Sequence, residues 1–165
     1  MAEIIVIAHN IRSTHNIGSI FRTCEGFGVK KIILSGYSAY PRIENDTRLP
    51  HIVSKLTMQI HKTALDAETM MPFEHQEQPD LSAIRADGYT IVGLEQDKAS
   101  IPLPNYKPPQ KIALLLGEEV KGLTLDLLEQ CDQLIEIPMS GKKESFNVSV
   151  ATGIALYGLT ADSSH

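Results

Sequence analysis

A serine and an asparagine near the C-terminal end of the chain stand where a ligand could bind. Ser145 and Asn147 follow a charged, glycine-containing loop over residues 140–144. A loop of this kind offers backbone and side-chain hydrogen-bonding groups, and loops held between packed elements are frequent ligand sites. The same residues also fit an ordinary connection in which Ser145 or Asn147 only caps a helix. Both interpretations stay open on this stretch alone.

The segments on either side of this loop indicate what holds it. Residues 134–137 form an apolar run typical of a short strand, and Pro138 ends the run because proline cannot donate to a strand ladder. Residues 148–159 are apolar on nearly all sides, which is typical of a buried helix and not of a surface helix. The pattern therefore predicts a strand, a polar loop and a buried helix in succession.

The rest of the chain alternates apolar runs with helical patterns, which predicts an α/β fold with a parallel sheet between helices. The expected strands lie at residues 3–8, 32–34, 89–94 and 111–116. The last of them is the most apolar, so we expect it at the centre of the sheet. The expected helices are 16–28, 81–86 and 124–130, with a helical turn over 64–70, an ambiguous segment over 49–62 and a proline-rich loop over 99–110.

Length and charge fit one domain over residues 1–165 with an uneven distribution of charge. The net charge of the 165 residues is −5. Residues 1–62 carry eight Lys or Arg against four Asp or Glu, so their net charge is +4, and the remainder carries −9. This asymmetry fits an anion-binding face on an acidic protein, and it fits a solvated basic surface equally well.

The sequence disfavours several classes of protein and site. No apolar run is long enough to span a bilayer and no leader opens the chain, so we expect a soluble cytoplasmic protein with no membrane partner. Cys24 and Cys131 lack metal-ligand spacing and are expected to be reduced, buried thiols. The histidines form neither an HExxH pair nor a Cys/His cluster, so no metal is expected. Phosphate-loop, dinucleotide-binding and GxSxG signatures are absent.

Three segments, taken in order, carry a more specific pattern. The first lies at 16–28 and includes Arg22, the second at 116–123 reads Leu-Gly-Glu-Glu-Val-Lys-Gly-Leu, and the third at 137–149 ends in Ser-Phe-Asn-Val-Ser. Each is a weak signal alone. Together, at these separations, they resemble the three ordered motifs of the SpoU/TrmH family of RNA ribose 2′-O-methyltransferases, within the SPOUT superfamily.

The resemblance covers nearly the whole chain and implies a fold. It implies a parallel sheet between helices whose C-terminal stretch is threaded into a deep trefoil knot, and the knot creates a pocket for S-adenosylmethionine. It also implies a homodimer with the first and last helices in the interface. The chain departs from the family at Phe146, where Leu or Met is usual, and at Asp66, where glycine is common. It also lacks the accessory RNA-binding domain of some members, which leaves the RNA target open.

The resemblance implies roles for individual residues as well. The implied cofactor-binding residues are Leu94, Gly117, Ile137, Met139 and Ser145. The implied catalytic residues are Arg22, Asn16, Glu119, Ser145 and Asn147. Each role has a plainer interpretation. Leu94 fits a core leucine equally well, Gly117 a turn glycine, Ser145 and Asn147 helix caps, and Arg22 a surface arginine in an ordinary salt bridge.

Two of these roles follow from the chemistry of the side chains. Glu119 is expected to hold Asn16 or a loop backbone, because a carboxylate would repel an RNA phosphate. Family proposals make Arg22 a base, but a guanidinium stays protonated at ordinary pH. We therefore expect Arg22 to clamp a phosphate bidentately and to set the ribose hydroxyl in line with the methyl group.

The sequence thus predicts an S-adenosylmethionine-dependent RNA 2′-O-methyltransferase that acts on tRNA or rRNA, with tRNA favoured. The first alternative is a non-catalytic, knotted RNA-binding or assembly module. The second is a small-molecule methyltransferase, which a contiguous basic face would argue against.

Overall fold

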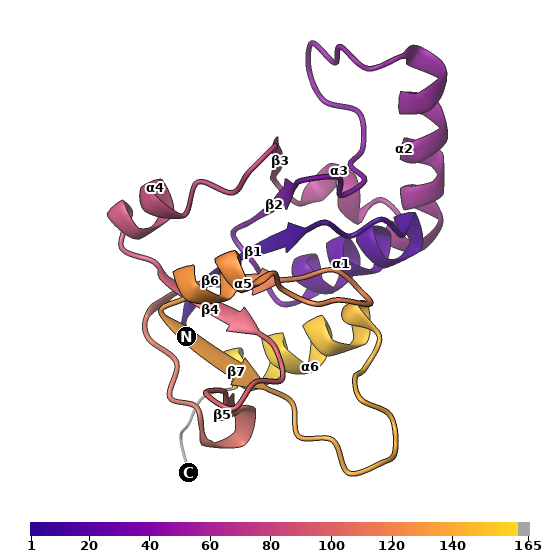
Figure 1. Ribbon diagram of the computed structural model, residues 1–165. Coiled ribbons are helices and arrows are strands. Elements are labelled where there is room, and N and C mark those ends of the chain that lie inside the picture. The colour runs from indigo at the N-terminus through magenta and orange to yellow at the C-terminus, as the bar shows by residue number, and fades with distance from the viewer. Residues whose placement is uncertain (162–165) are drawn as a thin grey trace.

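Seven parallel strands form one sheet in the order β3-β2-β1-β6-β4-β7-β5 (Figure 1). The computed structural model describes residues 1–161. The strands are β1 Glu3–His9, β2 Lys31–Ser35, β3 Phe73–Gln76, β4 Thr90–Leu94, β5 Ile101–Pro102, β6 Lys111–Leu116 and β7 Gln133–Glu136. Because every pairing is parallel, the carboxyl ends of neighbouring strands lie at the same edge of the sheet, and so do the loops that follow them.

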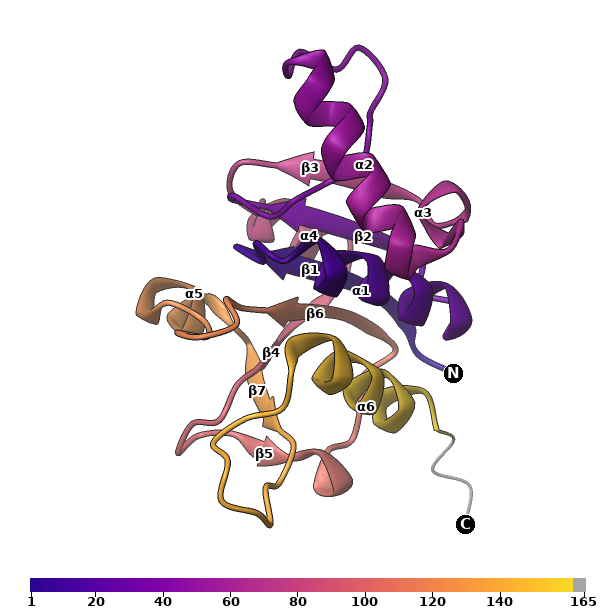
Figure 2. The same cartoon turned by 90° about the vertical axis from the view of Figure 1, so that its right-hand side faces the viewer.

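Helices cover both faces of this sheet. They are α1 Thr14–Gly26, α2 Pro50–Ala64, α3 Ala67–Met70, α4 Leu81–Ala86, α5 Leu125–Gln130 and α6 Val148–Thr160, with a 3-10 turn η1 at Leu103–Asn105. One core layer joins α1, α2, α3 and α6 to the sheet, and a second layer joins α4 and α5 to the opposite face (Figure 2).

Burial on both faces explains the continuous apolar runs of the central strands. In β1, Val6 packs into the layer with α1 and α6, whereas its neighbour Ile7 packs into the layer with α4 and α5, and neither side chain is exposed. A strand with this environment has no polar face, so its sequence does not alternate. The most apolar strand, β6, lies in the middle of the sheet between β1 and β4, which confirms its expected place.

Two late strands, β6 and β7, are inserted between strands that precede them in the sequence. β6 lies between β1 and β4, and β7 lies between β4 and β5, although both inserted strands come later in the sequence than their neighbours. The loops after β4, β6 and β7 therefore meet at one edge, although β4 ends at Leu94 and β7 ends 42 residues later, at Glu136.

Several expectations need correction. β3 was not expected, and the loop predicted over 99–110 contains β5 and η1. Both strands are short, half-exposed edge strands, so neither has an apolar pattern. The ambiguous segment over 49–62 is α2, which begins with Pro50 in its first turn.

Other expectations about burial also need revision. The last helix, α6, is not buried all round, because Val150 is 50% exposed and Tyr157 is 69% exposed. Cys24 is buried as expected, whereas Cys131 is only partly buried. Among residues 1–161, every helix is too short or too polar to cross a membrane.

Candidate active site

A cavity of about 320 Å³ lies where the loops after β4, β6 and β7 meet. Ligands of open parallel sheets bind at this edge, because the loops there are supported by the strands and expose backbone groups. The lining comes from four stretches of chain: Leu94–Gln96, Leu116–Gly122, Glu136 with Ile137, and Glu144–Phe146 with Val148 and Ala151.

Four of the five expected cofactor-binding residues line this cavity. They are Leu94, Gly117, Ile137 and Ser145. Met139 is not among the lining residues, so the structure does not bring it to the cavity with the other four. Leu94 and Ile137 are partly buried against the core, and they give the cavity an apolar wall.

Gly117 is required by the loop itself. A Cβ at this position would lie 2.5 Å from the backbone nitrogen of Leu123 and 2.5 Å from the carbonyl carbon of Gly122. The loop closes on itself through paired backbone hydrogen bonds between Glu118 and Gly122, at 2.9 and 3.2 Å. Close approach of a ligand, the reason expected from the sequence, is therefore not needed to explain this glycine.

Glu95 holds the same loop from the neighbouring strand, and sequence reasoning missed it. Its Oε2 accepts a hydrogen bond from the backbone N–H of Leu123 at 2.8 Å. Gly122 has φ +67°, and a Cβ there would lie 2.2 Å from Glu95 Oε2, so this contact needs a residue without a side chain. The only signal in the sequence was an acid directly after an apolar strand.

The cavity is strongly acidic. Five glutamates line it, Glu95, Glu118, Glu119, Glu136 and Glu144, against a single lysine, Lys121. Carboxylates gathered around a partly enclosed space create a negative potential that attracts cations and repels anions such as phosphate. The arrangement therefore favours a ligand that carries positive charge.

A chain of hydrogen bonds joins the three motif segments at this edge. Asn16 Nδ2 donates to Glu119 Oε1 at 3.4 Å, and Asn147 Nδ2 donates to Asn16 Oδ1 at 3.2 Å. The backbone N–H of Ser13 also donates to Glu119 Oε1, at 3.3 Å. Glu119 therefore contacts both Asn16 and a loop backbone, the two holding contacts that the sequence analysis expected of it.

Asn147 also settles which residue caps the last helix. Its Oδ1 accepts hydrogen bonds from the backbone N–H groups of Ser149 and Val150, at 2.9 and 3.4 Å. Asn147 is thus the N-cap of α6, while Ser145 lines the cavity without capping. The same amide side chain both starts the helix and, through its Nδ2, joins it to α1.

Arg22 lies outside the cavity. It is an exposed residue of α1, and within residues 1–161 no hydrogen bond or ion pair holds its guanidinium. The next residue, Thr23, faces α6: a Cβ at Gly153 would lie 3.6 Å from its Cγ2. Arg22 itself has no described contact with α6, and it follows Gly18, which packs on α2, by four residues on α1.

Two loop residues, Tyr37 and Arg12, lie beside the second motif. Tyr37 Oη donates to Glu118 Oε2 at 2.8 Å, and the Arg12 guanidinium lies 4.5 Å from the centre of the Tyr37 ring. The hydrogen bond to Glu118 raises the pKa of Tyr37. These residues join the loops after β1, β2 and β6 at the rim of the site.

Curated relatives match this chain over nearly its whole length. A tRNA (guanosine(18)-2'-O)-methyltransferase of Aquifex aeolicus is 31% identical over 155 residues, which are 94% of this chain and 67% of the relative. The tRNA (guanosine(18)-2'-O)-methyltransferase TARBP1 of Mus musculus is 29% identical over 97% of this chain, but over only 9% of its own length. This chain thus spans from about a tenth to two thirds of these relatives.

Solved structures with a similar fold include two that are named as SpoU enzymes. The TrmH/SpoU tRNA modifying enzyme of A. aeolicus superposes with a TM-score of 0.76 at 25% identity, covering 97% of this chain and 75% of that one. The SpoU methyltransferase AviRb of Streptomyces viridochromogenes, solved with the cofactor AdoMet, gives 0.75 at 25% identity over 96% of this chain and 59% of that one. The model of the SpoU rRNA Methylase family matches residues 3–157, and this protein belongs to that family.

Proposed function

We propose that this protein is an RNA methyltransferase that transfers a methyl group from S-adenosylmethionine to a ribose 2′-hydroxyl. The observation that carries the proposal is the hydrogen-bond chain Glu119–Asn16–Asn147, which joins three motif segments beside the acidic cavity. The two relatives described above are named as tRNA 2′-O-methyltransferases, which supports tRNA as the substrate. A relative named for 23S rRNA, RlmB of Acinetobacter baylyi, is 29% identical over 93% of this chain, so rRNA is the other candidate.

The chemistry of the cavity lining supports S-adenosylmethionine as its ligand. This cofactor supplies a methyl group bonded to a positively charged sulfonium, and it also carries an ammonium and an adenine ring. The five glutamates suit the positive groups, and Leu94 and Ile137 offer apolar cover for the ring. We propose that Gly117 and Ser145 contribute backbone and hydroxyl groups at the same wall.

The catalytic roles divide between fixed and exposed residues. Glu119 and Asn147 hold Asn16, so the amide groups keep one orientation before RNA arrives. Arg22 is exposed and unpaired within the described chain, so its guanidinium is free to pair with a phosphate. We propose that it grips a phosphate and sets the 2′-hydroxyl in line with the methyl group, a role that keeps the guanidinium protonated throughout.

We further propose a single domain with a knotted C-terminal stretch, assembled as a homodimer. The insertion of β6 and β7 between earlier strands is compatible with threading of the last segment. Exposed apolar residues on α6, together with the bordering α1, offer the surface for a second copy. Location in the cytoplasm stays a prediction.

Transfer of a labelled methyl group from S-adenosylmethionine to unmodified tRNA and rRNA transcripts tests the function. We expect transfer to one class of RNA and protection of one phosphodiester from alkaline cleavage, which reports a 2′-O-methyl group. An RNA that binds without transfer would favour a non-catalytic assembly module. Transfer to a small molecule alone would favour a small-molecule methyltransferase.

A further inference from the structure

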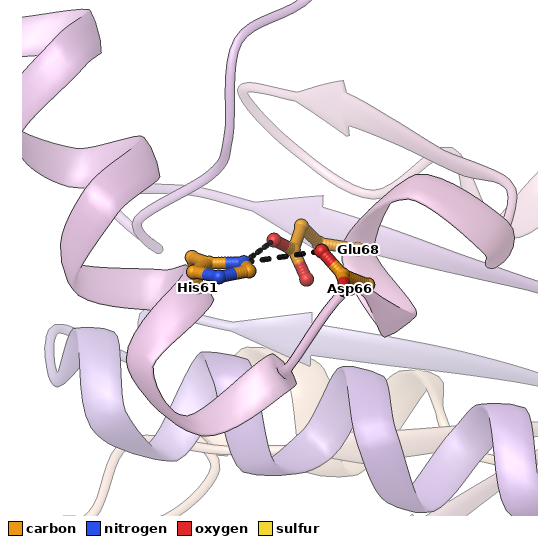
Figure 3. Close-up of side chains that lie close together, drawn as sticks. All are labelled: His61, Asp66 and Glu68. Atoms are coloured by element: carbon orange, nitrogen blue, oxygen red, sulfur yellow. Dashed lines mark hydrogen bonds and ion pairs between the residues drawn. The ribbon is translucent and has the colours of Figure 1, made fainter.

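Three ligand-type side chains meet at the turn between α2 and α3, on the far side of α1 from α6. His61 Nδ1 lies 2.6 Å from Glu68 Oε1 and 3.6 Å from Asp66 Oδ1. One ligand atom from each residue lies within 4.8 Å of the other two. Figure 3 shows His61, at the end of α2, pointing across the turn at the two carboxylates. None of these residues lines the cavity of the proposed active site.

Glu68 is an unusual member of this group because it is buried. Its side chain is only 6% exposed, whereas those of His61 and Asp66 are 50% and 69% exposed. Its second oxygen, Oε2, is shielded from solvent and has no hydrogen-bond partner among residues 1–161. A buried carboxylate oxygen without a donor is costly, and such atoms in native structures point to an ion or water at the site.

Asp66 occupies a backbone position that suits glycine. Its φ is +76°, and Leu65 before it has φ +50°. Glycine adopts this conformation freely, whereas a residue with a side chain adopts it at a cost. The side chain that aspartate brings is the second carboxylate facing His61.

We propose that His61, Asp66 and Glu68 bind a zinc ion. One imidazole nitrogen with two carboxylate oxygens is a ligand set that zinc accepts, with water completing four-coordination. Ligand atoms of a tetrahedral zinc lie about 3.3 Å apart, given bonds of about 2.0–2.1 Å. The His61–Asp66 distance is close to this value, and the exposed His61 ring must move away from Glu68 by a fraction of an ångström as zinc replaces their hydrogen bond.

The ligand chemistry favours zinc over magnesium or calcium. The hard cations prefer all-oxygen ligand sets with more ligands than this turn provides, whereas imidazole suits zinc and its transition-metal neighbours. Cobalt(II), which takes zinc sites with visible absorption, is therefore a suitable probe. The proposal replaces the expectation, drawn from sequence spacing alone, that no metal binds.

A metal here would stiffen the support of the first motif. The end of α2 packs tightly on α1: Thr63 Oγ1 donates to His15 O at 2.8 Å, and a Cβ at Gly18 would lie 2.3 Å from Ile60 O. Asn16 lies between these two contacts in sequence, in the first turn of α1. Because zinc would bind the folded turn and not the unfolded chain, it would raise the temperature of unfolding.

The experiment measures zinc binding to the full-length, chelator-treated protein by calorimetry at pH 8, where protons compete least for histidine. We expect one zinc per chain, visible absorption with cobalt(II), and a higher unfolding temperature with zinc but not with magnesium. His61→Ala and Glu68→Gln should each weaken zinc binding at least tenfold, as expected for the loss of a direct ligand. His51 is an exposed histidine at the other end of α2, so His51→Ala is the matched control and should bind zinc normally.

Asp66→Gly provides a variant that cannot be dismissed as misfolded. Glycine fits φ +76°, so the metal-free variant should unfold at the same or a higher temperature than the parent protein. It should nevertheless lose at least tenfold in zinc affinity and most of the zinc-dependent rise in unfolding temperature. The proposal is overturned if the parent protein binds no zinc, or if zinc binding survives in both His61→Ala and Asp66→Gly.

Discussion

Asn16 has two hydrogen-bonding ends, and both are occupied by residues from distant parts of the chain. Its Nδ2 donates to Glu119, and its Oδ1 accepts from Asn147. Since Glu119 can only accept and the capping oxygen of Asn147 is already committed to α6, the directions of these bonds are fixed. A rigid set of amides beside the cavity is what precise positioning of a ribose requires.

Asn147 caps α6 and also donates a hydrogen bond to Asn16. Two substitutions separate the capping function from the bond to Asn16. Asn147→Ala removes the cap of α6 and should cost about 1 kcal/mol of folding free energy. Asn147→Asp keeps a good cap but loses the N–H donor to Asn16, so its stability should match that of the parent protein. Both variants should lose single-turnover methyl transfer. If Asn147→Asp retains the parent rate, the bond to Asn16 has no part in catalysis.

Arg22 is the residue whose loss should separate chemistry from cofactor binding. Arg22→Ala should leave S-adenosylmethionine affinity unchanged, because the arginine does not line the cavity. Turnover should fall by about two to four orders of magnitude, as for other positioned charge-stabilising groups. Arg22→Lys should rescue poorly, because an ammonium cannot make the planar, two-pronged grip.

Arg12→Ala serves as the control for Arg22. Arg12 lies on the Tyr37 ring at the rim, so its loss should weaken RNA binding and reduce the salt dependence by about one phosphate contact. Single-turnover rates at saturating RNA and cofactor distinguish the two effects. A near-normal rate for Arg22→Ala under those conditions would make Arg22 a binding residue only.

At the scale of elements, burial decided what the sequence could predict. β1 and β6 are buried on both faces, so their apolar runs gave the right boundaries within a residue. β3 is a half-exposed edge strand of sequence Phe-Glu-His-Gln, and no periodic pattern marks it. The tight closure at Gly117 and the partnership of Glu95 with Leu123 depend on contacts between separate elements, which spacing along one segment cannot reveal.

Glu95 should hold the loop after β6 in the form that binds the cofactor. Glu95→Ala leaves the N–H of Leu123 without its acceptor and should lower S-adenosylmethionine affinity by roughly tenfold or more, since hydrogen bonds to charged groups contribute about 1.5–3 kcal/mol. Glu95→Gln keeps an oxygen acceptor but removes the charge, so it should lose less. Calorimetric titration with S-adenosylmethionine measures the affinity of each variant and of the parent protein. Equal affinity in all three proteins would exclude this role.

The loop between β2 and α2 should respond to acid through Asp46. Asp46 accepts from Arg48 at 2.7 Å, and Arg48 also donates to the carbonyls of Tyr40 and Pro41. The hydrogen bond from the Arg48 side chain holds the pKa of Asp46 well below its usual range. A carboxyl group with a lowered pKa stabilises the fold above its unfolded pKa of about 3.9, and this contribution is lost as the pH falls further.

Asp46→Asn should therefore unfold at a lower temperature than the parent protein at pH 7, because the asparagine cannot form the ion pair. The difference between the two proteins should shrink as the pH falls below about 4. Thermal unfolding followed by circular dichroism across this range measures it. A difference that stays constant with pH would show that the ion pair contributes nothing to stability.

At the scale of the whole molecule, local patterns could predict the class of sheet but not the order of its strands. Strand and helix periodicity predicted a parallel α/β sheet, but not that β6 and β7 return between earlier strands. That topology brings segments 103 and 131 residues apart into hydrogen-bonding contact. It also leaves α6 at the surface with apolar residues exposed, where the sequence alone indicated a buried helix.

This exposed face of α6 argues for a second copy of the chain. Val150 and Tyr157 are seven residues apart, two helical turns, so they lie on the same face. Gly153 lies between them, and within residues 1–161 an added Cβ there would meet just Thr23 of α1, at 3.6 Å, so a partner can approach closely. Thr23 of α1 lies beside Gly153, so a dimer through this face would involve the edge of α1 as well as α6.

Light scattering at micromolar concentration should give the mass of a dimer for the parent protein. Val150→Glu places a charge in the proposed interface and should give a monomer, with a large loss of methyl transfer if the site needs both subunits. Met58→Glu changes an exposed apolar residue on α2, 66% exposed against 50% for Val150, and this control should remain dimeric and active. A monomeric parent protein would exclude the dimer, and Arg22 would then have to act within its own chain. A Val150→Glu variant that stays dimeric would place the interface on another surface.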